Sequence, residues 1–548
     1  MPARMMLWAQ RIAIALFVGS LLIGMLVPVY TDEVAWRYLE RAALDGIDKP
    51  LNDGCGPNSF ASPVFFMWPV RAFSAAMGTQ FADPFYVRLS GIFYALLITA
   101  LTVLLIRRLA AGERQARLVT TIVFSLLGLG MMPWVLVWSR PEQPLVAALL
   151  GAALIAFGSG GAPRETTSAT TWRRAIAILL LGLVALSYHL KGVVLAPAFA
   201  VCLLWCGRGR GTFRPRLIVG GVLVIATALA AHYWVDRSRC PGDPILAAHY
   251  AQANIAAALS RGDDWRSMVA GVLRNANPMS YVWLISPSTN PMSRWLPIHL
   301  IGRDEAQLWL SILVLCWKPV LYFSLALLAF VAFGQLRARR LDLRLVLPIT
   351  LFGVAIVWAA SQLRPNIYES LFGLPLLALV IVLALSSPMV RSGWLRWGEW
   401  LAMPLLLVAI ASPVRMTMLY GPAMIAAAGQ RGYIADQPFS QPVFGYDDIQ
   451  PRILATARQC GIPLDRRLHG LLIDDTTYFA FVRSYRPEHW LGTLSVWNGS
   501  ISDPVAHLRG IGSDGMVVGC HMLAADLRGR AHSNGPFCCL GPRDWAAK

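Results

Sequence analysis

The stretch IAIALFVGSLLIGMLVPVYTDE, Ile12 to Glu33, decides the fold class of this chain. A helix needs about 20 predominantly apolar residues to cross the hydrocarbon core of a bilayer, and this run supplies them. It continues directly into Thr31, Asp32 and Glu33 without the small-x-small site of a cleaved signal peptide. We therefore expect the segment to remain in the protein as a membrane anchor.

The composition extends this interpretation to the whole chain. Of 548 residues, 56% are hydrophobic and only 14% are Asp, Glu, Lys or Arg, whereas about 25% of the residues of an ordinary soluble protein are charged. So few charges argue against a soluble multidomain enzyme, and the high apolar fraction excludes a disordered chain. We expect an all-α polytopic membrane protein with about eleven transmembrane helices. The expected spans are 12–30, 86–106, 118–138, 144–158, 174–190, 193–206, 217–234, 317–333, 345–361, 371–386 and 400–416.

The distribution of arginine predicts the side of the membrane on which each loop lies. The net charge is +18, and a cytoplasmic N-terminus places most of the short-loop cations inside, as the positive-inside rule requires. This excess therefore implies no nucleic-acid partner. The inside loops are 107–117, 159–173, 207–216, 334–344 and 387–399. The short outer loops contain one cation each, namely Arg140, Lys191 and Arg364.

Two domains follow from these spans. Residues 1–416 form the transmembrane domain, including the outer loops 31–85 and 235–316, and residues 417–548 form a soluble domain outside the cytoplasmic (inner) membrane, in the periplasm or its equivalent. Within the outer loops, the apolar segments Pro63–Met77 and Ala306–Cys316 predict interfacial helices that lie on the outer leaflet. The C-terminal domain mixes strand-like and helix-like runs, which favours a small α/β domain.

The cysteines agree with this topology. Six of nine lie in segments expected to be exported: Cys55, Cys240, Cys460, Cys520, Cys538 and Cys539. An even number in an oxidising compartment indicates disulfides, whose pairing the sequence leaves open. Zinc is the alternative, although no CxxC or paired-histidine spacing is present.

The acidic pair Asp32-Glu33 is the first candidate for chemistry. It lies just beyond the outer end of the first span, where ionisable groups are costly unless they are used. One carboxylate is suited to act as a general base on a hydroxyl group while its neighbour orients it or binds a cation. A solvated start of an outer loop is the alternative.

The three lone outer cations form the second candidate group, because they lie at the depth of the lipid phosphates. Arginine suits bidentate phosphate contact and lysine acts as a point charge. Lysine is otherwise scarce, with only four in the chain, so Lys191 is informative. Snorkelling side chains at helix ends are the alternative. Weaker candidates for substrate binding near these cations or at another outer edge are Glu142, His189, Tyr368 and Lys318.

In order and spacing, four segments between residues 10 and 390 resemble the GT-C superfold of polyprenyl-phosphate-sugar-dependent glycosyltransferases. The resemblance is closest to the branch of protein O-mannosyltransferases and lipid A aminoarabinose transferases. The four segments are Asp32-Glu33; Ser139–Leu145, with Glu142 where Asp is usual; His189–Leu195, with Val193 where Pro is common; and Arg364–Tyr368 followed by the Leu-Pro-Leu run Leu374–Leu379.

The resemblance implies a membrane glycosyltransferase that moves a sugar from a polyprenyl-phosphate donor to a glycan, lipid or protein acceptor by inverting displacement. Asp32 is then the catalytic base and Glu33 supports it, while Arg140, Lys191 and Arg364 hold the donor phosphate. No cofactor is required, although a divalent metal at Asp32, Glu33 and Glu142 is compatible with the residues. The expected partners are the lipid-linked donor, membrane lipids and the acceptor. A lipid-linked-sugar flippase or other transporter is the alternative function, and a sensor or assembly scaffold is a third.

Overall fold

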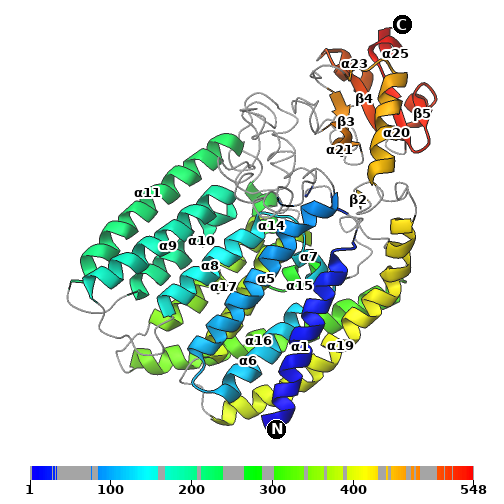
Figure 1. Cartoon of the computed structure of the whole chain (residues 1–548). Coiled ribbons are helices and arrows are strands. Elements are labelled where there is room, and N and C mark those ends of the chain that lie inside the picture. Colours follow the sequence, from blue (N-terminus) through cyan, green and yellow to red (C-terminus); the bar gives the residue numbers. More distant parts are fainter. Residues whose placement is uncertain are drawn as a thin grey trace.

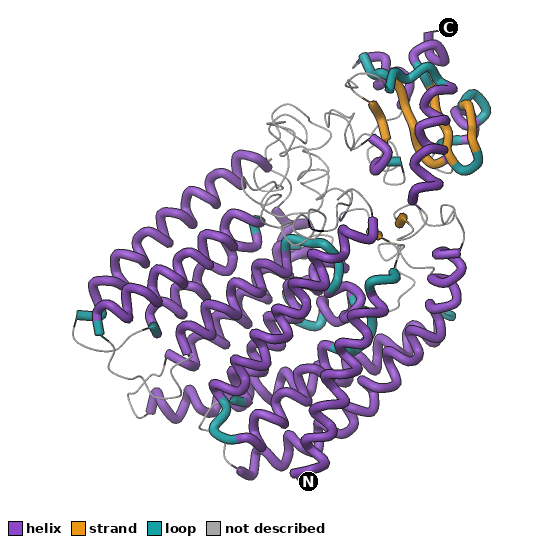
Figure 2. The backbone as a smooth tube through the Cα atoms, in the orientation of Figure 1, coloured by secondary structure: helices purple, strands orange, loops and turns teal. Residues whose placement is uncertain are grey.

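The computed structural model places a bundle of long helices below a small mixed domain (Figures 1 and 2). It describes residues 3–27, 29–30, 33, 76, 84–157, 167–206, 211–238, 265–286, 302–337, 343–362, 367–386, 392–429, 440–441, 446–464, 471–473, 477–481, 503–510, 512–520 and 523–546. The predicted interfacial helix Pro63–Met77 lies outside the described residues, apart from Ala76.

Each of the eleven predicted spans overlaps helix in the structure. The first span ends earlier than its predicted boundary at residue 30, because α1 stops at Gly24 and Val29–Tyr30 form a strand. The helices are α1 (Ala3–Gly24), α5 (Pro84–Leu109), α6 (Glu113–Leu127), α7 (Met132–Leu136), α8 (Glu142–Phe157), α9 (Ser168–Tyr188), α10 (Lys191–Trp205), α11 (Phe213–Ser238), α16 (Arg303–Arg337), α17 (Leu343–Ser361), α18 (Ser370–Leu385) and α19 (Ser392–Gly429). Among the described residues, seven helices are long and apolar enough to cross a membrane, and three shorter apolar helices accompany them. The predicted multi-pass membrane protein is thus confirmed.

One predicted span is broken in two. The run 118–138 forms α6 and α7, separated at Gly128–Met131. Gly130 adopts a φ of 59°, in the left-handed region that glycine reaches without steric cost. Its backbone N–H donates to the Ser412 hydroxyl at 2.8 Å, so the break is tied to α19.

The predicted surface helix Ala306–Cys316 is not a separate element. It is the first part of α16, which continues through Lys318 and Pro319 to Arg337. A proline inside a helix removes one backbone hydrogen bond, and here the apolar sequence on both sides keeps the helix intact. The start of α16 is also held by an ion pair between Glu305 and Arg415 of α19, at 2.6 Å.

The helices run alternately between two ends of the bundle (Figure 1). We call the end with the N-terminus the N-terminal end and the opposite one the distal end. The arginines Arg107, Arg108, Arg114, Arg214 and Arg337 lie at helix termini of the N-terminal end. At the distal end, α1 and α9 finish and α8, α10 and α18 begin. The short helices α14 (Trp265–Asn275), α15 (Ser280–Leu284) and η3 (Ile367–Glu369) also lie there.

The C-terminal domain lies beyond the distal end, in orange and red in Figure 1. Its sheet has the strand order β3-β4-β6-β5, with β3 parallel to β4 and the other pairs antiparallel. The elements are α20 (Tyr446–Gln459), β3 (Leu471–Ile473), α21 (Tyr478–Phe481), α23 (Pro504–Gly510), β4 (Gly515–Gly519), α24 (Ala525–Arg528), β5 (His532–Asn534), β6 (Phe537–Leu540) and α25 (Pro542–Ala546). The expected small α/β domain is therefore present, and its boundary at 416 stays a prediction because α19 continues to Gly429.

A short antiparallel pair connects the two parts of the chain. Strand β1 (Val29–Tyr30), which follows α1, pairs with β2 (Ser440–Gln441), which precedes α20. The segment that leads to the acidic pair is thereby joined to the segment that leads to the C-terminal domain.

Two disulfides brace the sheet. Neighbouring residues of a strand point to opposite faces, so Cys538 and Cys539 in β6 bond on different sides. Cys539 bonds to Cys460 and Cys538 bonds to Cys520. Four of the six cysteines expected in disulfides are thus paired, and Cys55 and Cys240 lie outside the described residues.

This pairing predicts the number of free thiols in cysteine variants. Cys460→Ser should add one thiol to the wild-type count because it releases Cys539, whereas the double variant Cys460→Ser/Cys539→Ser should return to the wild-type count. The measurement is mass spectrometry after alkylation of the unfolded, unreduced protein. A double variant with two extra thiols would show that Cys460 and Cys539 each have another partner.

Candidate active site

The distal end contains a buried cluster of charged side chains from three separate parts of the sequence. Lys191, the first residue of α10, has its Nζ 2.5 Å from Oε1 of Glu142 in α8 and 3.0 Å from Oε2 of Glu369 in η3. Arg140 forms a forked pair with Glu142, with both N–O distances at 3.2 Å. Lys191 is 1% exposed and Glu142 is fully buried. We call Arg140, Glu142, Lys191 and Glu369 the charge cluster.

Aromatic rings enclose the cations of the charge cluster. The Arg140 guanidinium lies 3.9 Å from the ring centre of Tyr368, which is close enough for a cation–π contact. The Lys191 ammonium lies 5.3 Å from the ring centre of Trp358, 5.4 Å from that of Tyr368 and 5.8 Å from that of Phe372. These rings keep water away, so the charges act on one another more strongly than at a surface.

The turn between α7 and α8 holds Arg140 in place. The Gln143 side chain donates to the carbonyl oxygens of Leu136, at 2.6 Å, and Trp138, and its own carbonyl accepts the backbone N–H of Arg140 at 3.1 Å. Gln143 therefore braces the turn from inside, as expected for a buried amide whose hydrogen-bonding groups must be satisfied.

Glu33 connects the acidic pair to this same turn. Its carboxylate accepts the backbone N–H of Ser139, at 2.8 Å, and pairs with Arg88 of α5 at an N–O distance of 2.7 Å. Both charged side chains are fully buried. Arg88 also donates to the carbonyl oxygen of Gly24 at the end of α1, at 2.9 Å. Glu33 thus joins the chain after α1 to α5 and to the residue beside Arg140.

Lys191 is positioned by a close approach of α10 to α9. A Cβ at Gly192 would lie 2.1 Å from the carbonyl oxygen of Ala185, so only glycine fits at this position. The Lys-Gly order in the sequence therefore has a packing reason. Since Gly192 lets α10 begin directly against α9, its neighbour Lys191 is brought over Glu142 in the adjoining α8.

His189 lies in the connection between α9 and α10. Its Nδ1 accepts the backbone N–H of Lys191 at 3.3 Å, which leaves Nε2 to carry the proton of the neutral ring. The ring thus contacts the backbone at the start of α10, next to the residue that holds the ammonium group.

The structure brings together five of the nine candidate side chains around Lys191: Arg140, Glu142, His189, Tyr368 and Lys191 itself. Glu33 reaches the same turn through Ser139. Lys318 lies exposed on α16, within a continuous helix, and is not part of the charge cluster. Asp32 and Arg364 lie outside the described residues.

Two charged residues of this region are missed by the sequence patterns. Glu369 immediately follows Tyr368 and precedes the apolar helix α18. Its signal is the same as that of Asp32-Glu33, a carboxylate at a membrane edge. Arg88 lies near the start of an apolar span, where a cation implies a buried counter-charge. The sequence shows no signal that this counter-charge is Glu33.

Two of the three carboxylates predicted to suit a divalent metal are paired with cations. Glu142 contacts Arg140 and Lys191, and Glu33 contacts Arg88, whereas Asp32 lies outside the described residues. In the C-terminal domain, ligand atoms of Cys460, His532 and Asp544 lie within 4.8 Å of one another. The sulfur of Cys460 is bonded to Cys539, however, so it is not the thiolate that a metal binds.

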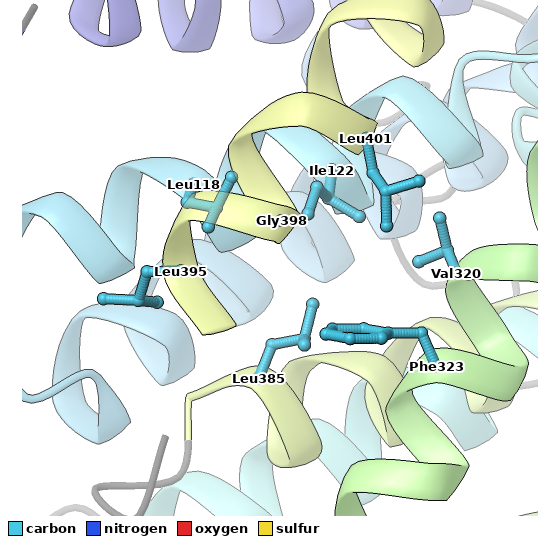
Figure 3. A pocket seen from close by; sticks show the side chains of 8 residues that line it. All are labelled: Leu118, Ile122, Val320, Phe323, Leu385, Leu395, Gly398 and Leu401. Atoms are coloured by element: carbon cyan, nitrogen blue, oxygen red, sulfur yellow. The ribbon is translucent and has the colours of Figure 1, made fainter. Parts of the chain in front are cut away.

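A pocket elsewhere in the bundle has a different character (Figure 3). It is lined by Leu118, Ile122, Val320, Phe323, Leu385, Leu395, Gly398 and Leu401. These residues come from α6, α16, α18 and α19, towards the N-terminal end. The lining contains no charged side chain, so this pocket does not suit a phosphate group.

Loss of the Glu33 charge should destabilise the protein. Glu33→Gln leaves the buried Arg88 cation without its counter-charge, which costs about 3–5 kcal/mol, and we expect a lower midpoint of thermal unfolding in detergent. The double variant Glu33→Gln/Arg88→Met removes both charges and should recover part of the loss. Unfolding of Glu33→Gln at the wild-type temperature would contradict the proposed anchoring role.

The close approach at Gly192 predicts a second stability difference. Gly192→Ala forces the new methyl group against the Ala185 carbonyl and should cost about 1–3 kcal/mol, as overpacking does. Gly221→Ala in α11 is the matched control, because a Cβ there meets nothing within 4 Å. Thermal unfolding of the two variants side by side measures the difference, and equal midpoints would contradict the packing argument.

Comparison with known proteins gives distant structural neighbours. No protein-family model matches the sequence, and no curated protein matches it. The chain aligns over 98% of its length with 98% of ArnT from Cupriavidus metallidurans, solved bound to undecaprenyl phosphate, at 14% identity and a TM-score of 0.47. It also aligns over 93% of its length with 69% of the archaeal oligosaccharyltransferase AglB from Archaeoglobus fulgidus, solved with an inhibitory peptide and a dolichol-phosphate, at 11% identity and a TM-score of 0.47.

Both neighbours have the GT-C glycosyltransferase fold that the sequence motifs resemble. At this identity and TM-score the likeness assigns no activity to the chain. The case for a function therefore rests on the side chains of the distal end.

Proposed function

We propose that this protein is a membrane glycosyltransferase that uses a polyprenyl-phosphate-linked sugar. The observation that carries the proposal is the buried cluster in which Arg140 and Lys191, from distant parts of the sequence, share Glu142 at one end of an apolar bundle. Burying charges in such surroundings costs several kcal/mol for each ion, and apolar side chains of similar volume would be at least as stable. Ionisable residues at membrane depth are for this reason usually functional.

The position of the cluster suits a lipid-linked phosphate. A polyprenyl chain stays in the bilayer, so its phosphate is confined to the membrane surface, and the charge cluster lies at the bundle end from which the C-terminal domain extends. Arginine and lysine together offer both a planar fork and a point charge for phosphate oxygens. In this proposal the distal end faces the outside of the cytoplasmic membrane, and Arg364 contributes a third cation.

The hydrogen bond between Glu33 and Ser139 supports a role for the acidic pair beside these cations. Ser139 is the residue before Arg140, so the chain segment that contains Asp32 and Glu33 is fastened to the phosphate-binding turn. Since Glu33 is already occupied by Arg88 and Ser139, Asp32 is the member of the pair that we assign as the base. Glu33 supports it by fixing the segment.

The reaction proposed is a single displacement at the anomeric carbon. The acceptor hydroxyl gives its proton to Asp32 and its oxygen attacks the anomeric carbon, while the bond from that carbon to the phosphate oxygen breaks. The electron pair of this bond goes to the phosphate, and the configuration of the sugar inverts. Arg140, Lys191 and Arg364 stabilise the charge that builds on the departing polyprenyl phosphate. Polyprenyl phosphate is a good leaving group, so the scheme requires no metal.

The test is complementation of a deletion strain, with mass spectrometry of its envelope glycans, lipids and glycoproteins. We expect deletion to remove one sugar modification and to leave the lipid-linked sugar available outside. Asp32→Asn should restore less than about 1% of it, because a general base contributes a factor of 10² to 10⁴, and Lys191→Met should also fail. Arg337→Met, which removes an exposed cation from the last turn of α16 at the N-terminal end, is the control and should restore it fully.

Two outcomes would contradict this function. Full complementation by Asp32→Asn would show that Asp32 is not the base. Donor trapped on the inner face after deletion, with no loss of transferase activity in broken membranes, would indicate the flippase.

A further inference from the structure

Lys191 is contacted by two carboxylates, and one of them also holds Arg140. Glu142 contacts its ammonium at 2.5 Å and also holds Arg140, so this carboxylate links both cations. Glu369, which lies in η3, contacts the same ammonium at 3.0 Å. An ammonium group has three N–H donors, so one remains for an incoming phosphate oxygen.

The second carboxylate changes the charge that a phosphate meets. The charge cluster contains the cations Arg140 and Lys191 together with the anions Glu142 and Glu369, all of them buried. A pair of cations with one carboxylate would attract a phosphate strongly, whereas two carboxylates compensate both cations. The carboxylates also repel an incoming phosphate. The rings of Trp358, Tyr368 and Phe372 shield the site from water, so this repulsion is weakly screened.

The contacts of Glu369 allow its charge to be removed without loss of its other hydrogen bond, so its effect on phosphate affinity can be measured. Apart from Lys191, its carboxylate accepts the indole N–H of Trp358 at 2.5 Å. Its amide analogue retains an oxygen that can accept this N–H and loses only the negative charge. Glu142 offers no such clean change, because its replacement would release Arg140 as well.

We propose that Glu369 is a positioning residue that weakens the hold of Lys191 on a lipid phosphate, so that the phosphate product leaves the site. This inference rests on the proposed function. A transferase must bind its donor through the phosphodiester, with one negative charge, and then release a phosphate monoester that approaches two. A carboxylate next to Lys191 repels the doubly charged product more than the singly charged donor.

The test measures binding of farnesyl monophosphate, with farnesol as the uncharged probe, to the full-length protein in lipid nanodiscs by isothermal titration calorimetry. Wild type should prefer the phosphate, and Lys191→Met should lose this preference. Glu369→Gln should bind farnesyl monophosphate about tenfold more tightly, as expected for removal of a neighbouring like charge. Glu399→Gln, which breaks an ion pair with Arg114 at the N-terminal end, is the matched control and should leave the Kd unchanged.

A gain of affinity separates this role from a structural one, because a damaged site binds more weakly. If Glu369→Gln unfolds, Glu369→Asp draws the carboxylate back by one methylene and should give a smaller gain. Unchanged or weaker binding in a folded Glu369 variant overturns the inference and leaves the proposed phosphate site standing. Equal affinity of wild type for farnesyl monophosphate and farnesol overturns both.

Discussion

The contact between Lys191 and Glu142 is the interaction on which the distal end depends. It joins the start of α10 to the start of α8 inside an apolar bundle, and Arg140 and Glu369 attach the preceding turn and η3 to the same pair. An unpaired charge at this depth is strongly unfavourable. Each of the four side chains therefore requires the others, and the backbone segments that contain them are brought to one place.

The pair of Glu33 and Arg88 likewise joins separate segments through buried opposite charges, here at the end of α1. Arg88 contacts Gly24 and Glu33, while Glu33 reaches Ser139. The two ionic groups thus meet at adjacent residues of one turn, Ser139 and Arg140. The proposed reaction requires rigid cations at a membrane surface, and two connected ion groups within close-packed helices satisfy this requirement.

The sequence predicts the positions of the spans well, but it does not predict which charged side chains or cysteines pair with one another. Apolar length alone locates a membrane helix, so the eleven runs overlap helices. The end of the first run, which forms β1, the break at Gly130 and the start of α16 differ from expectation. Arg140 and Lys191 are predicted because each is the lone cation of a short outer loop, and Glu142 because it lies beside Arg140 in the sequence. Glu369 and Arg88 belong to neither pattern. The pairing of Cys460 with Cys539 and of Cys520 with Cys538 follows from strand register, which the sequence leaves open.

By itself, the sequence determined that this is a membrane protein with scarce charges and the positions of the few charges that break the apolar pattern. The free energy of transferring a helix into the bilayer depends on the composition of that helix alone, so the linear sequence is enough to predict it. Only the tertiary structure decided which charges meet, that Glu142 lies between two cations and that Glu369 is a second carboxylate on Lys191. Ion pairing depends on distances between residues as far apart as 142 and 369 in the chain, and these distances exist only after the helices have packed.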